Sequence, residues 1–231
     1  PPTPTEVQFD ALNKAYKYFN QKIFGGQLPG CILNFSRKSG THGFMAPERW
    51  RRVGEKQYST HEISLTPTTL YREPLLVFST LVHEMAHLWQ WEFGNPSRNG
   101  YHNAEWAGKM IEIGLMPSDT GQPGGKITGQ AMTHYIMTGG KYEQAFKKMP
   151  QRYLLPFTSL EGDLMKSLLT GAPGGDPEGG SVGVSAKVKK LRPGSKNKVK
   201  YSCPGCKANV WGKPELRLQC MECEQQFEVA E

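Results

Sequence analysis

The sequence predicts an α+β protein with a small antiparallel sheet, followed by a small C-terminal β-ribbon that binds metal. Three observations predict this class. Segments with the apolar spacing of helices alternate with short strand-like runs over the first half of the chain. The pattern H-E-x-x-H lies inside the most apolar helical segment, at residues 83–87. Two C-x-x-C pairs lie after residue 200 of a 231-residue chain, which is long enough for one core and an appendage.

The first helix is predicted from its start and end signals. Thr3 is a suitable N-cap, Pro4 suits the first helical position, and Glu6 can reach back to the cap. Apolar residues then recur near helical spacing over residues 7–23. Gly25-Gly26 follows this segment and is expected to end the helix.

Short strands are expected at residues 31–36, 41–46 and 57–65, where β-type runs are separated by Gly-, Pro- and Arg-rich connections. Ile63 and Leu65 alternate with their neighbours before a turn begins. A sheet edge beside the metal-binding helix would be a place where an extended peptide could add as a further strand.

The H-E-x-x-H helix is predicted to start near Pro74 and to run to Phe93, because Gly94-Asn95-Pro96 stops it. His83 and His87 lie one turn apart on one face, so both imidazoles can reach a single Zn²⁺. Glu84 lies about 100° round the helix, near enough to hold a water on that ion. Apolar residues occur on more than one side of this helix, so its buried polar side chains need a partner such as zinc.

The third zinc ligand has two candidates in the sequence. Fourteen residues separate His87 from His102, enough for a loop that turns the chain back past the metal. Glu105 lies one turn further along a short helix expected to run through Met110 and Ile113, and some zinc sites use two His and one Glu. The remaining histidines are interpreted as structural or substrate-facing: His42, His61 and His134.

The segment after this helix contains further expected helices. Residues 117–127 are rich in Pro and Gly, and helical pieces are expected at about 128–138 and 141–149. The spacing from Thr158 to Glu161 matches a capping box and predicts a helix at about 159–170. From Gly171 to Ser181 the composition changes to Gly, Pro, Asp and Glu, which predicts a flexible linker.

The cysteine pattern indicates metal binding rather than disulfides. Two C-x-x-C pairs at this spacing predict a zinc ribbon whose four thiolates close one structural zinc site: Cys203, Cys206, Cys220 and Cys223. Short strands are expected at 207–211, 216–218 and 225–229. Cys31 lies in an apolar run and is interpreted as an inert core thiol. Cysteines that bind metal or stay reduced are typical of intracellular proteins. Together with the lack of a signal-peptide pattern and of an apolar run of transmembrane length, they predict an intracellular protein of the cytoplasm, nucleoid or nucleus.

The positive charge is concentrated in one segment. The net charge is +7, and residues 182–200 carry no acid but these seven basic residues: Lys187, Lys189, Lys190, Arg192, Lys196, Lys198 and Lys200. Such a run can be a solvated tether. Beside a zinc ribbon it could also make sequence-independent, salt-sensitive contact with nucleic acid. Tyr201 and Trp211 could stack on unpaired bases, although a ribbon needs at least one of them in its core.

Residues 6–115 resemble a SprT-like domain, the zincin family that includes Spartan-type proteases. The resemblance rests on Ile23-Phe24-Gly25-Gly26-Gln27-Leu28-Pro29, on His61-Glu62-Ile63-Ser64-Leu65, on Leu81 to His87, and on His102. It implies a zincin-like metalloprotease fold, a catalytic zinc held by His83, His87 and His102, and Glu84 as the catalytic residue. It also implies action on proteins attached covalently or tightly to DNA, and it favours His102 over Glu105.

The interpretation is therefore a zinc metalloendopeptidase in which Glu84 activates a water on the catalytic zinc. The expected domains are a SprT-like zincin domain at 1–170 (core about 6–115, helical extension 116–170), a linker at 171–198 and a zinc ribbon at 199–231. Tyr101 and His61 are candidates for the oxyanion donor. Expected partners are protein substrates and DNA, with no membrane contact and a monomeric state.

Two other functions stay open at this stage. One is a zinc peptidase of a specific cellular or mobile-element protein, with the ribbon as a docking module. The other is a non-catalytic DNA-binding or regulatory protein with a silent metal site. The complete H-E-x-x-H motif, followed by His102, argues against a silent site, because such a site has no need of Glu84.

Overall fold

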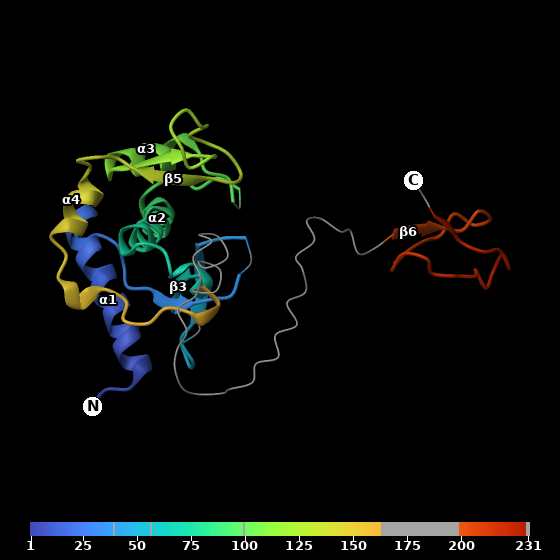
Figure 1. Cartoon of the computed structure of the whole chain (residues 1–231), viewed down its shortest axis with the longest axis horizontal. Coiled ribbons are helices and arrows are strands. Elements are labelled where there is room, and N and C mark those ends of the chain that lie inside the picture. Colours follow the sequence, from blue (N-terminus) through green and yellow to red (C-terminus); the bar gives the residue numbers. More distant parts are fainter. Residues whose placement is uncertain (39, 56, 99, 163–198, 230–231) are drawn as a thin grey trace, which may run out of the picture. The chain divides into compact units, whose positions relative to one another are not determined.

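The computed structural model describes residues 1–162 and 199–229, except residues 39, 56 and 99 (Figure 1). The chain divides into two compact units, Pro1–Gly175 and Asp176–Glu231. The linker expected at 171–198 and most of the helix expected at 159–170 lie outside the described residues. Residues 160–162 are helical.

Helix α1 (Pro4–Ile23) begins and ends where its signals predict. The Thr3 side chain accepts a hydrogen bond from the Glu6 backbone, and the Glu6 carboxylate accepts one from the Thr3 backbone at 2.7 Å. Beyond the helix, Gly25 and Gly26 adopt positive φ angles of 65° and 76°, which favour glycine. One face of α1 is buried in the core: Ala11, Leu12, Ala15, Tyr16, Phe19 and Ile23.

The first sheet contains β1 (Ile32–Phe35), β2 (Gly43–Arg51) and β3 (Ser59–Leu65), in the order β1-β3-β2. Strand β3 pairs with β2 in antiparallel and with β1 in parallel orientation. The prediction of an antiparallel sheet was therefore wrong for this sheet, which is mixed. The chain reverses direction between β1 and β2 and again between β2 and β3, so β1 and β3 run the same way.

Helix α2 (Pro74–Phe93) confirms the predicted bounds of the H-E-x-x-H helix. A short 3₁₀ turn, η1 (Pro67–Thr69), precedes it, and α3 (Ala104–Glu112) follows it. Helix α2 lies between the mixed sheet and α3 (Figure 1). Most of its side chains between Val77 and Gln90 are buried, so the helix is covered on nearly all sides. In the described part of the chain, no helix combines the length and apolar composition needed to cross a membrane.

The segment after α3 is not the all-helical extension that the sequence predicted. Strands β4 (Leu115–Ser118) and β5 (Thr133–Ile136) form an antiparallel pair, so the helix expected at 128–138 was wrong. The helix expected at 141–149 is confirmed as α4 (Lys141–Lys147), and η2 (Gln151–Tyr153) follows it. Tyr142 of α4 is fully buried and donates a hydrogen bond to the Leu75 carbonyl, so this segment completes the core of the first unit.

The second unit contains β6 (Val199–Ser202), β7 (Asn209–Gly212) and β8 (Glu228–Val229), in the order β7-β6-β8 with antiparallel pairing. Strands β7 and β8 lie within the predicted runs 207–211 and 225–229, apart from the last residue of β7. The strand expected at 216–218 does not form, and a single bridge joins Gln219 to Gln226 instead.

Candidate active site and metal centres

Three histidines converge in the first unit. Helix α2 carries His83 and His87, and the loop before α3 carries His102. One ring nitrogen from each of them lies within 4.8 Å of the others, and the Nε2 atoms of His87 and His102 are 3.1 Å apart. The structure therefore brings together the three residues predicted as ligands of the catalytic zinc.

The donor set of this cluster fits zinc. The Nδ1 atom of His102 lies 3.2 Å from the Gly129 carbonyl oxygen, which can only accept, so Nδ1 carries the proton. The Nε2 lone pair of His102 then points at the Nε2 atom of His87. Two nitrogens bound to one zinc at about 2.0–2.1 Å are about 3.3 Å apart in tetrahedral geometry, close to the distance found here. These residues could hold a metal ion.

The indole of Trp106 packs against all three histidines. Its ring centroid lies 4.9 Å from that of His83, 5.0 Å from that of His87 and 4.4 Å from that of His102. The His87 ring is stacked on it with an interplanar angle of 17°. Trp106 is fully buried, and its Nε1 has no hydrogen-bond partner among the described residues. The apolar core therefore restricts the orientation of the three imidazoles.

Glu84 is buried beside these histidines. Burial raises the pKa of its carboxyl group to about 8, although a backbone hydrogen bond from Met45 of β2 and the charge of Lys38 act in the opposite direction. A carboxyl group whose pKa lies near neutrality can both take and return a proton. Because Met45 belongs to β2, this strand also fixes the position of the carboxylate.

A cleft of about 1000 Å³ contains Glu84 and the three histidines. Strand β2 forms part of its wall, and in the described sheet β2 pairs only with β3. Tyr101 and Trp91 also line the cleft, and its basic lining residues are Lys38, Arg49 and Arg98. The cleft is therefore large enough for a peptide segment and lies beside an edge strand.

Glu105, the other candidate for the third ligand, lies outside the histidine cluster. Its Oε2 accepts hydrogen bonds of 2.7 Å from the Gln90 side chain and from the Asn95 backbone. A Cβ added to Gly94 would lie 2.5 Å from the same oxygen. Glu105, near the start of α3, therefore forms hydrogen bonds that hold the end of α2 beside it.

The remaining histidines take different places. His61 lies 3.0 Å from Glu92 through Nε2 and accepts the Glu48 backbone N–H at Nδ1, which fits a structural role. His42 is exposed beside a second cavity of about 510 Å³. His134 of β5 lies against His83, with the two Nδ1 atoms 3.1 Å apart. The sequence analysis missed this contact because it predicted a helix where β5 lies.

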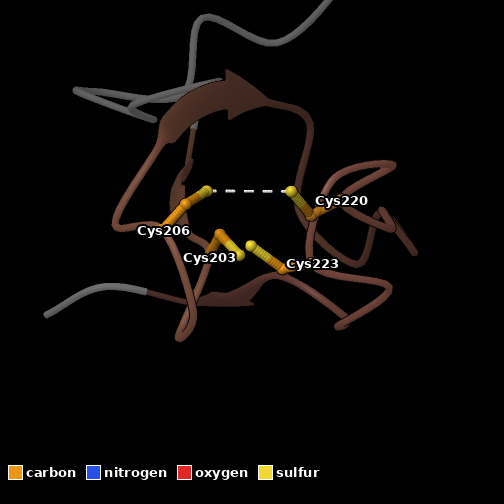
Figure 2. Close-up of side chains that lie close together, drawn as sticks. All are labelled: Cys203, Cys206, Cys220 and Cys223. Atoms are coloured by element: carbon orange, nitrogen blue, oxygen red, sulfur yellow. Dashed lines mark hydrogen bonds between the residues drawn. The ribbon is translucent and has the colours of Figure 1, made fainter.

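The four cysteines of the second unit form a second candidate metal centre (Figure 2). Their sulfurs lie within 4.8 Å of one another, and the Sγ atoms of Cys206 and Cys220 are 3.7 Å apart. This cluster is compatible with the predicted zinc ribbon. Cys31 lies in the first unit, where burial raises the pKa of its thiol to about 11, in agreement with an inert thiol.

The two C-x-x-C pairs fold into the same backbone turn. Lys207 N donates to the Cys203 carbonyl at 3.0 Å, and Glu224 N donates to the Cys220 carbonyl at 2.9 Å. Lys207 and Glu224 both adopt the left-handed conformation, with φ angles of 60° and 55°. The turns thus present two thiols each, as expected for the two halves of one tetrahedral site.

The basic segment is described only at Lys200, because Lys187, Lys189, Lys190, Arg192, Lys196 and Lys198 lie outside the described residues. Lys200 of β6 is exposed and lies opposite Trp211 of β7. Trp211 is 62% exposed, whereas Tyr201 is 2% exposed and its hydroxyl bonds to the backbone of Lys213 and Leu216. Tyr201 is therefore a core residue, and Trp211 is free to contact a partner.

Comparisons with known proteins identify a family for part of the chain. The model of the SprT-like family matches residues 12–125. An uncharacterized protein encoded in the region 3′ of mucB in Salmonella typhimurium is 38% identical over 61 residues, which are 26% of this chain and 80% of that protein. No solved structure matches this chain.

Proposed function

Because the chain belongs to the SprT-like family, we propose that it is a zinc-dependent metalloendopeptidase of zincin-like fold that cleaves proteins bound or crosslinked to DNA. The observation that carries this proposal is the convergence of His83, His87 and His102 beside Glu84 in a cleft with an edge strand. We also propose an intracellular location, which a DNA partner and cysteines in metal-binding pairs would suit.

Two zinc ions are assigned in this proposal. His83, His87 and His102 would hold the catalytic one, and the four cysteines would hold the structural one. When bound, the catalytic zinc supplies a Lewis acid that polarises the scissile carbonyl and acidifies water. Three neutral histidine ligands leave a fourth position open, whereas four thiolates fill the structural site.

Glu84 acts as the general base and then as the general acid. Its carboxylate takes a proton from the water whose oxygen bonds to the scissile carbonyl carbon, and it gives that proton to the leaving amine as the C–N bond breaks. Tyr101 lines the cleft and stays a candidate for the oxyanion donor. His61 is bonded to Glu92 and Glu48, so we no longer propose it for this role.

Strand β2 offers the binding edge for the substrate. Gly43, Phe44, Met45 and Ala46 line the cleft. A substrate segment in extended conformation would pair with the backbone of this strand and place a peptide bond beside Glu84. Backbone pairing is tolerant of sequence, which suits a protease that removes varied proteins from DNA.

The second unit would deliver the protease to DNA. Lys187 to Lys200 supply positive charge for phosphates, and the exposed Trp211 supplies a surface for an unpaired base. Lys200 and Trp211 lie opposite each other on neighbouring strands, so one nucleotide could contact both.

The experiment is cleavage of a test protein crosslinked to a DNA oligonucleotide, compared with the same protein without DNA. We expect cleavage by the zinc-loaded wild type that DNA stimulates, and none by Glu84→Gln with unchanged zinc content. Cleavage that is independent of DNA would favour the peptidase of a specific protein. DNA binding without any cleavage would favour the regulatory factor, and either result would overturn the proposal.

A further inference from the structure

One short stretch of chain, residues 129–134, supplies an outer contact to each of two proposed zinc ligands. His102 contacts Gly129, and His83 contacts His134. This stretch lies beyond residues 12–125, to which the family model extends. These contacts are therefore a property of this chain outside the part that the family model describes.

The contact of His83 belongs to a chain of hydrogen bonds that leads back to α2. The Ser79 hydroxyl donates to the Leu76 carbonyl at 2.9 Å, so its oxygen is free to accept from His134 Nε2, also at 2.9 Å. With its proton on Nε2, His134 has a lone pair on Nδ1. That lone pair accepts a hydrogen bond from Nδ1 of His83, 3.1 Å away.

The direction of this chain decides whether His83 can bind a metal. When His83 donates through Nδ1, its Nε2 carries a lone pair and can act as a ligand. In the reverse direction His134 would donate to His83, and the proton of His83 would sit on Nε2 and block coordination. The bond from Ser79 to the Leu76 carbonyl favours the first direction, because the hydroxyl has only one proton to give.

The contact of His102 is held by the backbone. His102 and Gly129 exchange two backbone hydrogen bonds, of 2.8 Å and 3.1 Å, and the Gly129 carbonyl also faces His102 Nδ1. The carbonyl cannot donate, so this imidazole has the same tautomer as His83, with Nε2 unprotonated. A second backbone hydrogen bond to this imidazole comes from Gly100. Residues 129–134 thus favour the metal-binding tautomer of two of the three ligands.

We propose that His134 is a positioning residue for the proposed zinc site, and that residues 129–134 prepare this site for the metal. The inference rests on the proposed function, because it assumes that His83 binds zinc. A side chain that hydrogen-bonds to a metal-binding histidine orients the imidazole ring and increases its basicity. Loss of such a side chain typically weakens metal binding about 10- to 100-fold.

The test measures zinc affinity of the full chain by competition with a chromophoric chelator. We expect His134→Leu to weaken the histidine site about 10- to 100-fold. His134→Asn keeps an acceptor oxygen near the position of Nδ1 and should recover much of the affinity. Ser79→Ala removes the acceptor for His134 Nε2 and should have a smaller effect. The matched control is His42→Leu. His42 is exposed and lines the second cavity, which His134 also lines, and this variant should bind zinc like the wild type.

Two further readouts separate the possible failures. The cysteine site provides an internal reference, because none of these substitutions lies in the second unit. Substitution with Co²⁺ reports the geometry of the histidine site through its visible bands, which should change in His134→Leu. Wild-type zinc affinity and cobalt bands in a folded His134→Leu chain would overturn the inference. If the wild type cleaved no protein but His134→Leu still lost zinc, the proposed function would fail and the inference would stand.

Discussion

Gly43 of β2 packs directly against Glu84 of α2. A Cβ atom added to Gly43 would lie 2.9 Å from the carbonyl oxygen of Ser64, 3.1 Å from Thr80 Cγ2 and 3.4 Å from Glu84 Cγ. The Ser64 oxygen belongs to the neighbouring strand β3 and cannot move aside alone. The absence of a side chain at this position therefore lets the edge strand approach the carboxylate closely.

Gly43→Ala should impair catalysis more than metal binding. The added methyl group moves β2 away from α2, which disturbs the Met45 bond to Glu84 and the edge on which the substrate binds. We expect kcat/KM to fall by at least tenfold and stability to fall by about 1–3 kcal/mol. Zinc content, measured by atomic absorption, should stay at the wild-type value. Full activity in this variant would show that the contact has no role in positioning Glu84.

Glu84→Gln should abolish peptide cleavage while the fold and both metals are retained. The amide preserves the size of the side chain but cannot take a proton from water. Cleavage, zinc content and the circular dichroism spectrum would be measured on the same preparation. A variant that keeps wild-type cleavage would remove Glu84 from the mechanism.

The five cysteines should differ in their reactivity toward an alkylating reagent. In the zinc-loaded protein, the four cysteines of the second unit are expected to be protected as metal ligands. After chelation Cys203 should react before Cys31, because a backbone hydrogen bond from Cys206 lowers the pKa of the Cys203 thiol to about 7, whereas burial raises the pKa of the Cys31 thiol to about 11 and leaves little thiolate at neutral pH. Mass spectrometry of peptides after timed alkylation measures the order. Early labelling of Cys31 would contradict its interpretation as a buried, inert thiol.

Trp211→Ala should weaken binding of single-stranded DNA without unfolding the second unit. Loss of one stacked base costs about 1–3 kcal/mol, and the ring is largely exposed. The control is Met221→Ala, which removes another apolar side chain that is 91% exposed in the same unit. Fluorescence anisotropy with a labelled oligonucleotide gives both affinities. Equal affinities for the two variants would argue against stacking on Trp211.

The salt dependence of DNA binding should change when the basic segment is neutralised. The change replaces six residues by Gln and leaves Lys200 in place: Lys187, Lys189, Lys190, Arg192, Lys196 and Lys198. Each lost phosphate contact on single-stranded DNA lowers the slope of log affinity against log salt by about 0.7. An unchanged slope would show that this segment makes no phosphate contacts.

Sequence signals predicted those parts of the fold that depend on residues close together in the chain. The capping residues around Thr3 and the stop after Phe93 gave the bounds of α1 and α2, because capping depends on residues close in sequence. The pair His83 and His87 and the four cysteines followed from ligand spacing, since each motif places its ligands on one helix face or one turn, whereas the choice of His102 over Glu105 followed from the family resemblance.

Other parts depend on pairing between distant residues. The residues of β5, Thr-His-Tyr-Ile at 133–136, show no alternation of apolar and polar positions that would indicate a strand, and all four are half-buried in the structure. This strand exists because it pairs with β4. The parallel pairing of β1 with β3 is likewise a long-range property. The role of His134 could not be predicted for the same reason, since it depends on where β5 lies.

Trp106 joins the proposed catalytic metal to the hydrophobic core of the first unit. Its indole touches the three imidazoles on one side and belongs to the same buried cluster as Phe19 and Leu81. Metal affinity and folding stability therefore both depend on the packing around Trp106. A destabilising change far from the cleft is expected to weaken metal binding at the three histidines together with the fold.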